Sequence, residues 1–165
     1  MKQEELTTLN SYLSFSLDQE CFGVNVGKVI EILEVPHITR IPKAPPFMRG
    51  VINLRGTVLP VVDTRLKFGL APKADTINTC IIVFSICIGE EQVMVGALVD
   101  AVQEVFEMPE SELRPTPSMG GRYKAEFIRG MARRDDEFIM VLDVDRIFAH
   151  EEILDLQLDL EALKA

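Results

Sequence analysis

Two blocks of this sequence occur twice, and the repeat constrains the fold more than any single motif. Residues 47–50, Phe-Met-Arg-Gly, correspond to residues 127–130, Phe-Ile-Arg-Gly, eighty positions later. In the same register, Val61, Asp63 and Phe68 correspond to Val141, Asp143 and Phe148. At a separation of 73 positions, Gly23, Val26, Val29, Glu31, Glu34 and Pro36 correspond to Gly96, Val99, Val102, Glu104, Glu107 and Pro109. The matches predict an internal duplication, with one loop seven residues longer in the second copy.

Short strands joined as hairpins dominate each copy. Residues 12–17 alternate apolar and polar side chains, and a second strand is expected at residues 21–26 after a polar turn. Further hairpins are predicted within residues 50–62, 79–99 and 127–142. About five strands per copy favour a mainly β fold of two small barrels. A barrel of this size buries little apolar surface by itself, so a shared core between the copies is expected.

The domain organisation follows from the duplication. Residues 1–150 are expected to form one domain of two barrel subdomains, at about 10–75 and 76–150, with exchange of strands possible at their boundary. Residues 151–165 are acidic and rich in leucine, which predicts a C-terminal helix or tail.

Helical signals elsewhere are brief. Residues 28–33 are predicted to form one or two helical turns before Pro36. Asp63 is expected to cap a short helix that Gly69 ends, and Asp143 to cap its counterpart in the second copy.

Composition excludes several classes of protein. The 165 residues carry a formal net charge of -9, which disfavours nucleic acid and anionic membranes as partners. The chain begins without the basic and apolar regions of a signal peptide, so a cytoplasmic location is expected. Three cysteines, Cys21, Cys80 and Cys87, cannot all pair within the chain, and buried free thiols are predicted.

Residues that could support catalysis are few. His37 and His150 are the only histidines, both expected at the surface, and neither has the spacing of a metal ligand. Asp63 and Asp143 could be compared with the carboxylate dyad of a two-lobed enzyme, which requires the two groups about 3 Å apart. Helix capping explains both residues more simply. Neither catalysis nor a metal or cofactor is therefore expected.

A tight corner at residues 53–56, Asn-Leu-Arg-Gly, carries the sharpest functional signal. Gly56 can adopt a positive φ angle, which would hold Arg55 at the tip of a hairpin. Arg55 could simply be solvated. Alternatively a carboxylate, with Glu31 the best candidate, could fix its guanidinium in one orientation for a partner.

These residues resemble the bacterial chemotaxis coupling proteins known as the CheW family. The resemblance extends from Tyr12 to Ala149 and rests on residues 22–26, 29–32, 39–42, 46–47, 50–56, 60–63, 67–68, 99–102 and 113–115. The most specific part runs from the Asn-Leu-Arg-Gly corner to Pro60-Val61-Val62-Asp63. One departure is Thr64, where the family commonly has leucine; a change in local packing is expected there.

The resemblance implies two five-stranded SH3-like barrels and a non-catalytic adaptor. Such an adaptor would link the cytoplasmic tips of chemoreceptors to the regulatory domain of a CheA-type histidine kinase, in arrays at the membrane. It also implies a receptor-binding site, with the kinase contacts unassigned. Carried over, the receptor-binding residues are Val29, Glu31, Gly50, Asn53, Leu54, Arg55 and Gly56. Three alternatives are a coupling-like module from a larger chain, an SH3-like RNA binder, and an enzyme with paired aspartates.

Overall fold

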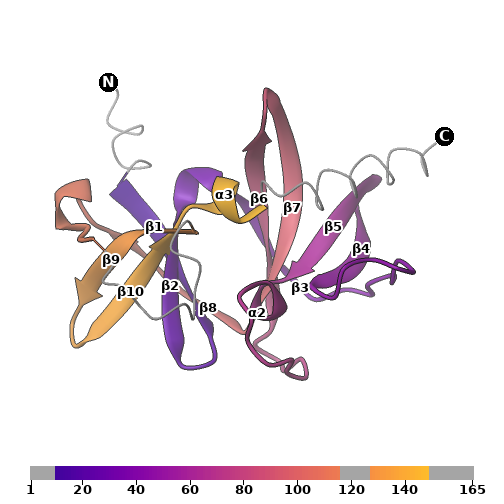
Figure 1. Ribbon diagram of the computed structural model, residues 1–165, viewed down its shortest axis with the longest axis horizontal. Coiled ribbons are helices and arrows are strands. Elements are labelled where there is room, and N and C mark those ends of the chain that lie inside the picture. The colour runs from indigo at the N-terminus through magenta and orange to yellow at the C-terminus, as the bar shows by residue number, and fades with distance from the viewer. Residues whose placement is uncertain (1–9, 116–126, 149–165) are drawn as a thin grey trace.

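Two five-stranded sheets lie side by side in the computed structural model, which describes residues 10–115 and 127–148 (Figure 1). Their strands are β1 (Ser11–Leu17), β2 (Glu20–Asn25), β3 (Val29–Glu34), β4 (Met48–Leu54), β5 (Thr57–Asp63), β6 (Cys80–Ile88), β7 (Glu91–Val99), β8 (Ala101–Glu107), β9 (Ile128–Arg134) and β10 (Glu137–Leu142). The short helices are η1 (Val26–Lys28), α2 (Thr64–Lys67), η2 (Glu110–Glu112) and α3 (Val144–Phe148). This is the predicted mainly β fold of two SH3-like barrels.

Each sheet combines strands from both copies of the repeat. The first has the order β8-β1-β2-β10-β9, and the second has the order β3-β6-β7-β5-β4. The hairpin β1–β2 of the first copy thus lies between β8 and β10 of the second copy and pairs with both. The hairpin β6–β7 of the second copy lies in the same way between β3 and β5 of the first. The expected division at residues 75 and 76 therefore does not describe the sheets. Exchange of strands at this boundary, expected as a possibility, does occur, and one whole hairpin from each copy takes part in it.

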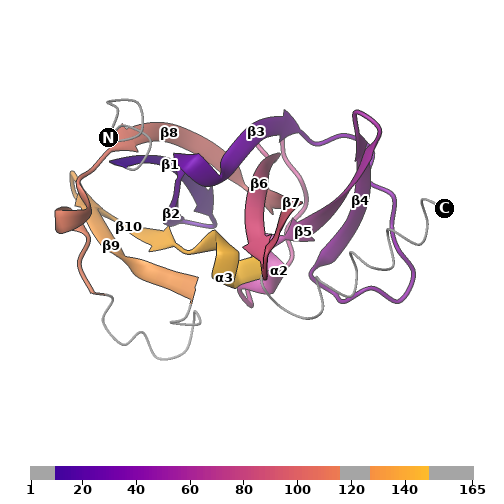
Figure 2. The same ribbon diagram turned by 90° about the horizontal axis from the view of Figure 1, so that it is seen from above.

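Short connections account for this exchange. Only Asp100 separates β7 from β8, and a hairpin needs at least two residues in its turn. Strand β8 therefore cannot fold back on β7 and crosses to β1 in the other sheet. Between β2 and β3 the single turn η1 makes the equivalent crossing, and β3 pairs with β6. The view from above shows these crossing segments passing between the two barrels (Figure 2).

The prediction of helix at residues 28–33 is wrong. The helical turn ends at Lys28, and the following residues form the antiparallel strand β3 on β6. Val29, Ile30 and Ile32 are β-branched, which favours an extended backbone once a partner strand is available. Half-buried and exposed side chains alternate along β3, as expected for a strand at the edge of a sheet.

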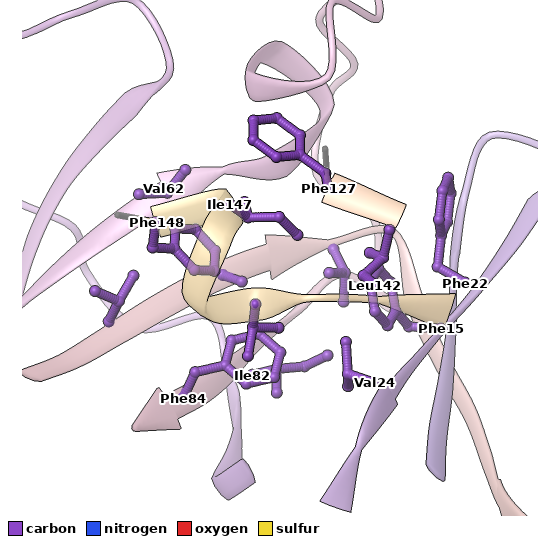
Figure 3. Packing of buried hydrophobic residues seen from close by; sticks show 14 of the residues in the cluster. Phe15, Phe22, Val24, Val62, Ile82, Phe84, Phe127, Leu142, Ile147 and Phe148 are labelled. Carbon is purple, nitrogen blue, oxygen red and sulfur yellow. The ribbon is translucent and has the colours of Figure 1, made fainter. Parts of the chain in front are cut away.

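The shared core predicted between the copies is confirmed. It is the largest of three buried apolar clusters found in the described residues, and helix α3 lies within it (Figure 3). Ile147 and Phe148 of α3 belong to this cluster, which contains side chains from both sheets. The ring centroid of Phe148 lies 6.1 Å from that of Phe84 in β6. A smaller cluster fills each barrel. The two barrels are therefore held as one body by apolar packing.

The two predicted helix caps are also confirmed. Asp63 Oδ1 accepts hydrogen bonds from the backbone N–H groups of Arg65, at 3.0 Å, and Leu66, at 3.4 Å. Asp143 Oδ1 accepts one from the N–H of Arg146, at 3.3 Å. Gly69 has a φ of 80°, as expected for the residue after a helix. Burial raises the pKa of Asp63 above its ordinary value, although the capping bonds act in the opposite direction.

Candidate functional site

The corner at the end of β4 is held by its own backbone and by Asn53. Arg55 and Gly56 both have positive φ angles, 50° and 85°, which is typical of a two-residue type I′ hairpin turn. Asn53 Oδ1 accepts a hydrogen bond from the Gly56 N–H at 2.8 Å. The predicted left-handed conformation of Gly56 is therefore present, and it places Arg55 at the tip of the hairpin.

Glu31 of β3 fixes the Arg55 guanidinium. Arg55 Nη2 donates a hydrogen bond to Glu31 Oε1, and the two side chains form an ion pair. The Arg55 side chain is 72% exposed, whereas that of Glu31 is 24% exposed. Because β3 and β4 are the two edge strands of the second sheet, the pair joins opposite edges of one barrel. The arrangement presents a cation to solvent in a defined direction.

The strand that carries Glu31 also presents apolar side chains. Ile30 and Ile32 are 46% and 45% exposed and alternate with Glu31 along β3. Val29, at the start of the strand, is half-buried and packs against the shared core. Leu54 is half-buried and packs inside the second barrel. Because successive side chains of a strand point to opposite faces, Ile30 and Ile32 lie on the face of β3 opposite Glu31, so the strand presents apolar surface on one face and the ion pair on the other.

The structure places Gly50 away from the Glu31–Arg55 pair, at the other end of β4. It is buried, and a Cβ atom at this position would lie 2.2 Å from the carbonyl oxygen of Thr39. This close approach lets Thr39 and Val51 exchange two backbone hydrogen bonds, of 2.9 and 2.8 Å. Gly50 therefore has a structural role, and it acts on the candidate site only through the path of β4.

The second copy contains a related ion pair that the sequence analysis did not identify. Asp135, which corresponds to Arg55, keeps the positive φ angle at 55° but reverses the charge. The preceding residue, Arg134, instead reaches Glu104, with 3.6 Å between Nη2 and Oε1. Its guanidinium also lies 4.5 Å from the centroid of the Phe106 ring. The sequence contains one indication of this pair: Glu104 corresponds to Glu31 in the repeat, so a similar ion pair could have been expected in the second copy.

A buried arginine at the junction of the barrels was also missed. Arg65, with a side chain only 7% exposed, forms ion pairs with Asp18 at 2.5 Å and Asp100 at 2.7 Å. Its Nε donates to the Ala71 carbonyl at 3.0 Å. Partial burial acts to lower the pKa of Arg65, but the two carboxylates together outweigh it and raise that pKa. The arrangement links α2 to the β1–β2 turn of the other sheet.

The environment of Thr64 accounts for a threonine where the family commonly has leucine. Its side chain is buried, and its hydroxyl donates a hydrogen bond to the Leu98 carbonyl of β7 at 2.5 Å. A buried hydroxyl needs such a hydrogen-bond partner, and this one has it. The change from leucine to threonine is therefore confined to local packing.

Other predicted residues have no part in this site. Cys21 is buried, Cys80 is half-buried and Cys87 is exposed, so the prediction of burial is wrong for Cys87, which lies near the end of β6. Burial raises the pKa of the Cys21 and Cys80 thiols. His37 is exposed, as expected, and His150 lies outside the described residues. Within residues 10–115 and 127–148 there is no cluster of side chains suited to bind a metal ion.

A family model described as a CheW-like domain matches residues 11–152. The chain belongs to the CheW family. A CheW chemotaxis protein from Klebsiella aerogenes is 31% identical over 147 residues, which are 89% of this chain and 86% of the relative. One from Rhizobium meliloti is 33% identical over 140 residues, 85% of this chain and 88% of the relative. Membership of the CheW family places the chain among chemotaxis scaffold proteins.

A solved CheW structure supports the same conclusion. The scaffolding protein TtCheW from Thermoanaerobacter tengcongensis matches with a TM-score of 0.77 and 31% identity, over 87% of this chain and 90% of that one. Among the helices formed by the described residues, none is long and apolar enough to span a membrane.

Proposed function

We propose that this CheW-family chain is a non-catalytic adaptor that couples chemoreceptors to a CheA-type histidine kinase. The family assignment and the likeness to a scaffolding protein support a binding role. The two aspartates that could suggest catalysis both cap short helices. The receptor partner is the cytoplasmic tip of a chemoreceptor, and the kinase partner is the regulatory domain of the histidine kinase. The adaptor is recruited to receptor arrays at the membrane.

The Glu31–Arg55 pair is the observation that carries the proposed receptor site. An exposed guanidinium held by a carboxylate loses little conformational entropy on binding, which favours a specific contact with a polar or acidic segment. Asn53 and Gly56 maintain the turn that carries Arg55. Val29 and Leu54 pack beneath the site, and Gly50 fixes the path of β4. Together these are the seven residues of the proposed site.

Co-sedimentation with receptor-containing membranes tests this proposal. Arg55→Glu reverses the exposed charge and repels Glu31, so we expect the variant to remain largely in the supernatant, with less kinase recruited. Arg134→Glu is the matched control, because it breaks the related pair with Glu104 in the other barrel. We expect it to sediment as the unmodified protein does. Equal sedimentation of Arg55→Glu, with an unchanged circular dichroism spectrum, would remove Arg55 from the site.

A further inference from the structure

A cationic groove lies at the start of β4. It has a volume of about 490 Å³, and its lining includes four cations, Arg40, Lys43, Arg49 and Lys73, one carboxylate, Asp63, and the apolar side chains of Ile41 and Ala44. These residues come from the connection between β3 and β4, from β4 itself, and from the segment after α2. A concave surface that combines apolar side chains with an excess of cations is suited to an amphipathic acidic segment.

Two of these cations have no counterion in the described part of the chain. Arg40 and Lys43 are exposed, and no ion pair forms between either residue and another described residue. Arg49, in contrast, pairs with Asp75 at 2.8 Å, and Lys73 lies 3.9 Å from Asp100. Two cations without a described counterion in one groove are notable in a chain whose net charge is -9. Their charge favours an anionic occupant.

The last described element of the chain, α3, ends in the shared core on which part of the groove lining packs. Phe148, the last residue of α3, is buried in the shared core, against which Ile41 and Ala44 also pack. The residues that follow carry alternating acidic and apolar side chains: Glu151, Glu152, Ile153, Leu154, Asp155, Leu156, Leu158, Asp159, Leu160 and Glu161. Residues 151–164 contain five carboxylates and one lysine. Their charge and apolar content complement those of the groove.

We propose that residues 151–164 dock in this groove of their own chain. The acidic side chains pair with Arg40 and Lys43, and leucines cover Ile41 and Ala44. Because Phe148 already lies in the shared core, the segment reaches the groove at a high effective concentration. Docking leaves the proposed receptor site open, since the groove and Arg55 lie at opposite ends of the seven-residue strand β4, roughly 20 Å apart at the rise of a β-strand.

Zero-length carbodiimide cross-linking of the full chain tests the docking. The reagent joins a lysine amine to a carboxylate in direct contact, and mass spectrometry identifies the joined residues. We expect links from Lys43 and Lys73 to carboxylates of residues 151–164, in the monomer band and independent of protein concentration. Lys28 and Asp145, with 2.7 Å between Nζ and Oδ2, provide the internal positive control. Raising the salt from 0.1 to 1 M should lower the tail links several-fold, because the Debye length falls from about 10 to about 3 Å.

Charge reversal distinguishes pairing from chance contact. Arg40→Glu/Lys43→Glu should reduce the Lys73–tail link about tenfold, whereas Arg133→Glu, at an exposed arginine in the other sheet, should leave it unchanged. Adding Asp155→Lys/Asp159→Lys to the first variant should restore the link through the remaining tail glutamates. Tail links found only between two copies would overturn the proposal in favour of exchange between molecules. Absence of tail links while the Lys28–Asp145 link forms would also overturn it.

Discussion

Arg65 and Asp145 occupy equivalent positions in the two copies of the repeat and carry opposite charges. Arg65 lies in α2 and pairs with Asp100 at 2.7 Å, and Asp145 lies in α3 and pairs with Lys28 at 2.7 Å. Asp100 and Lys28 belong to the two segments where the chain crosses between sheets. Each crossing is therefore tied to a short helix by an ion pair, with the polarity reversed between the copies.

The two ion pairs should differ in their contribution to stability. Arg65→Ala leaves Asp100 without its main counterion in a largely buried position, so we expect unfolding free energy to fall by about 3 kcal/mol. Lys28→Ala removes a pair whose side chains are about a third exposed, and the expected loss is about 0.5 kcal/mol. Urea denaturation at pH 7 measures both. Equal losses in the two variants would contradict the difference in burial.

Asp63 should make stability depend on pH with an unusual sign. Burial raises its pKa in the folded state, so between about pH 4, where an unfolded aspartate ionises, and the folded pKa, the folded protein binds more protons. Its contribution to stability is therefore fully present below about pH 4 and is lost as the pH rises through the folded pKa. The substitution Asp63→Asn would keep the helix cap and remove the titrating group. The stability of the unmodified protein relative to Asp63→Asn should thus decrease as the pH is raised through this window; an increase would contradict the burial of Asp63.

Two glycines, Gly50 in β4 and Gly56 in the turn that follows the strand, should respond differently to alanine. In Gly50→Ala the new Cβ would collide with the Thr39 carbonyl oxygen, 2.2 Å away, and we expect a loss of about 3 kcal/mol or more. In Gly56→Ala nothing lies within 4 Å, so only the positive φ angle is unfavourable, at a cost of about 1 kcal/mol. Thermal unfolding measures both. If Gly50→Ala unfolds at the temperature of the unmodified protein, Gly50 has no structural role at Thr39.

The sequence identified features that depend on neighbouring residues. The hairpins, the Asp63 and Asp143 caps and the turn at Gly56 follow from local backbone preferences. Exchange of hairpins between the sheets did not follow, because exchanged and unexchanged arrangements pair equivalent strands and bury equivalent side chains. The single residue Asp100 between β7 and β8 is the physical reason for the exchange, but it is visible only when both strand ends are known.

The same distinction applies to the candidate site. The Glu31–Arg55 pair could be proposed from the sequence, because arginine readily pairs with a carboxylate and Glu31 was the best candidate. Arg65 was overlooked because its partners, Asp18 and Asp100, are distant in sequence and meet only in the exchanged fold. The strand β3 was mistaken for helix because its pairing with β6 overrides a short local pattern.

The most direct test of the proposed adaptor function is receptor-dependent control of the kinase in a reconstituted mixture of receptor membranes, kinase and this protein. The measurement is the rate of kinase autophosphorylation with and without receptor. With Arg134→Glu, we expect the receptor-dependent change seen with the unmodified protein. With Arg55→Glu, the receptor-dependent change should disappear although the variant remains folded. Full receptor control of the kinase by folded Arg55→Glu would contradict the account.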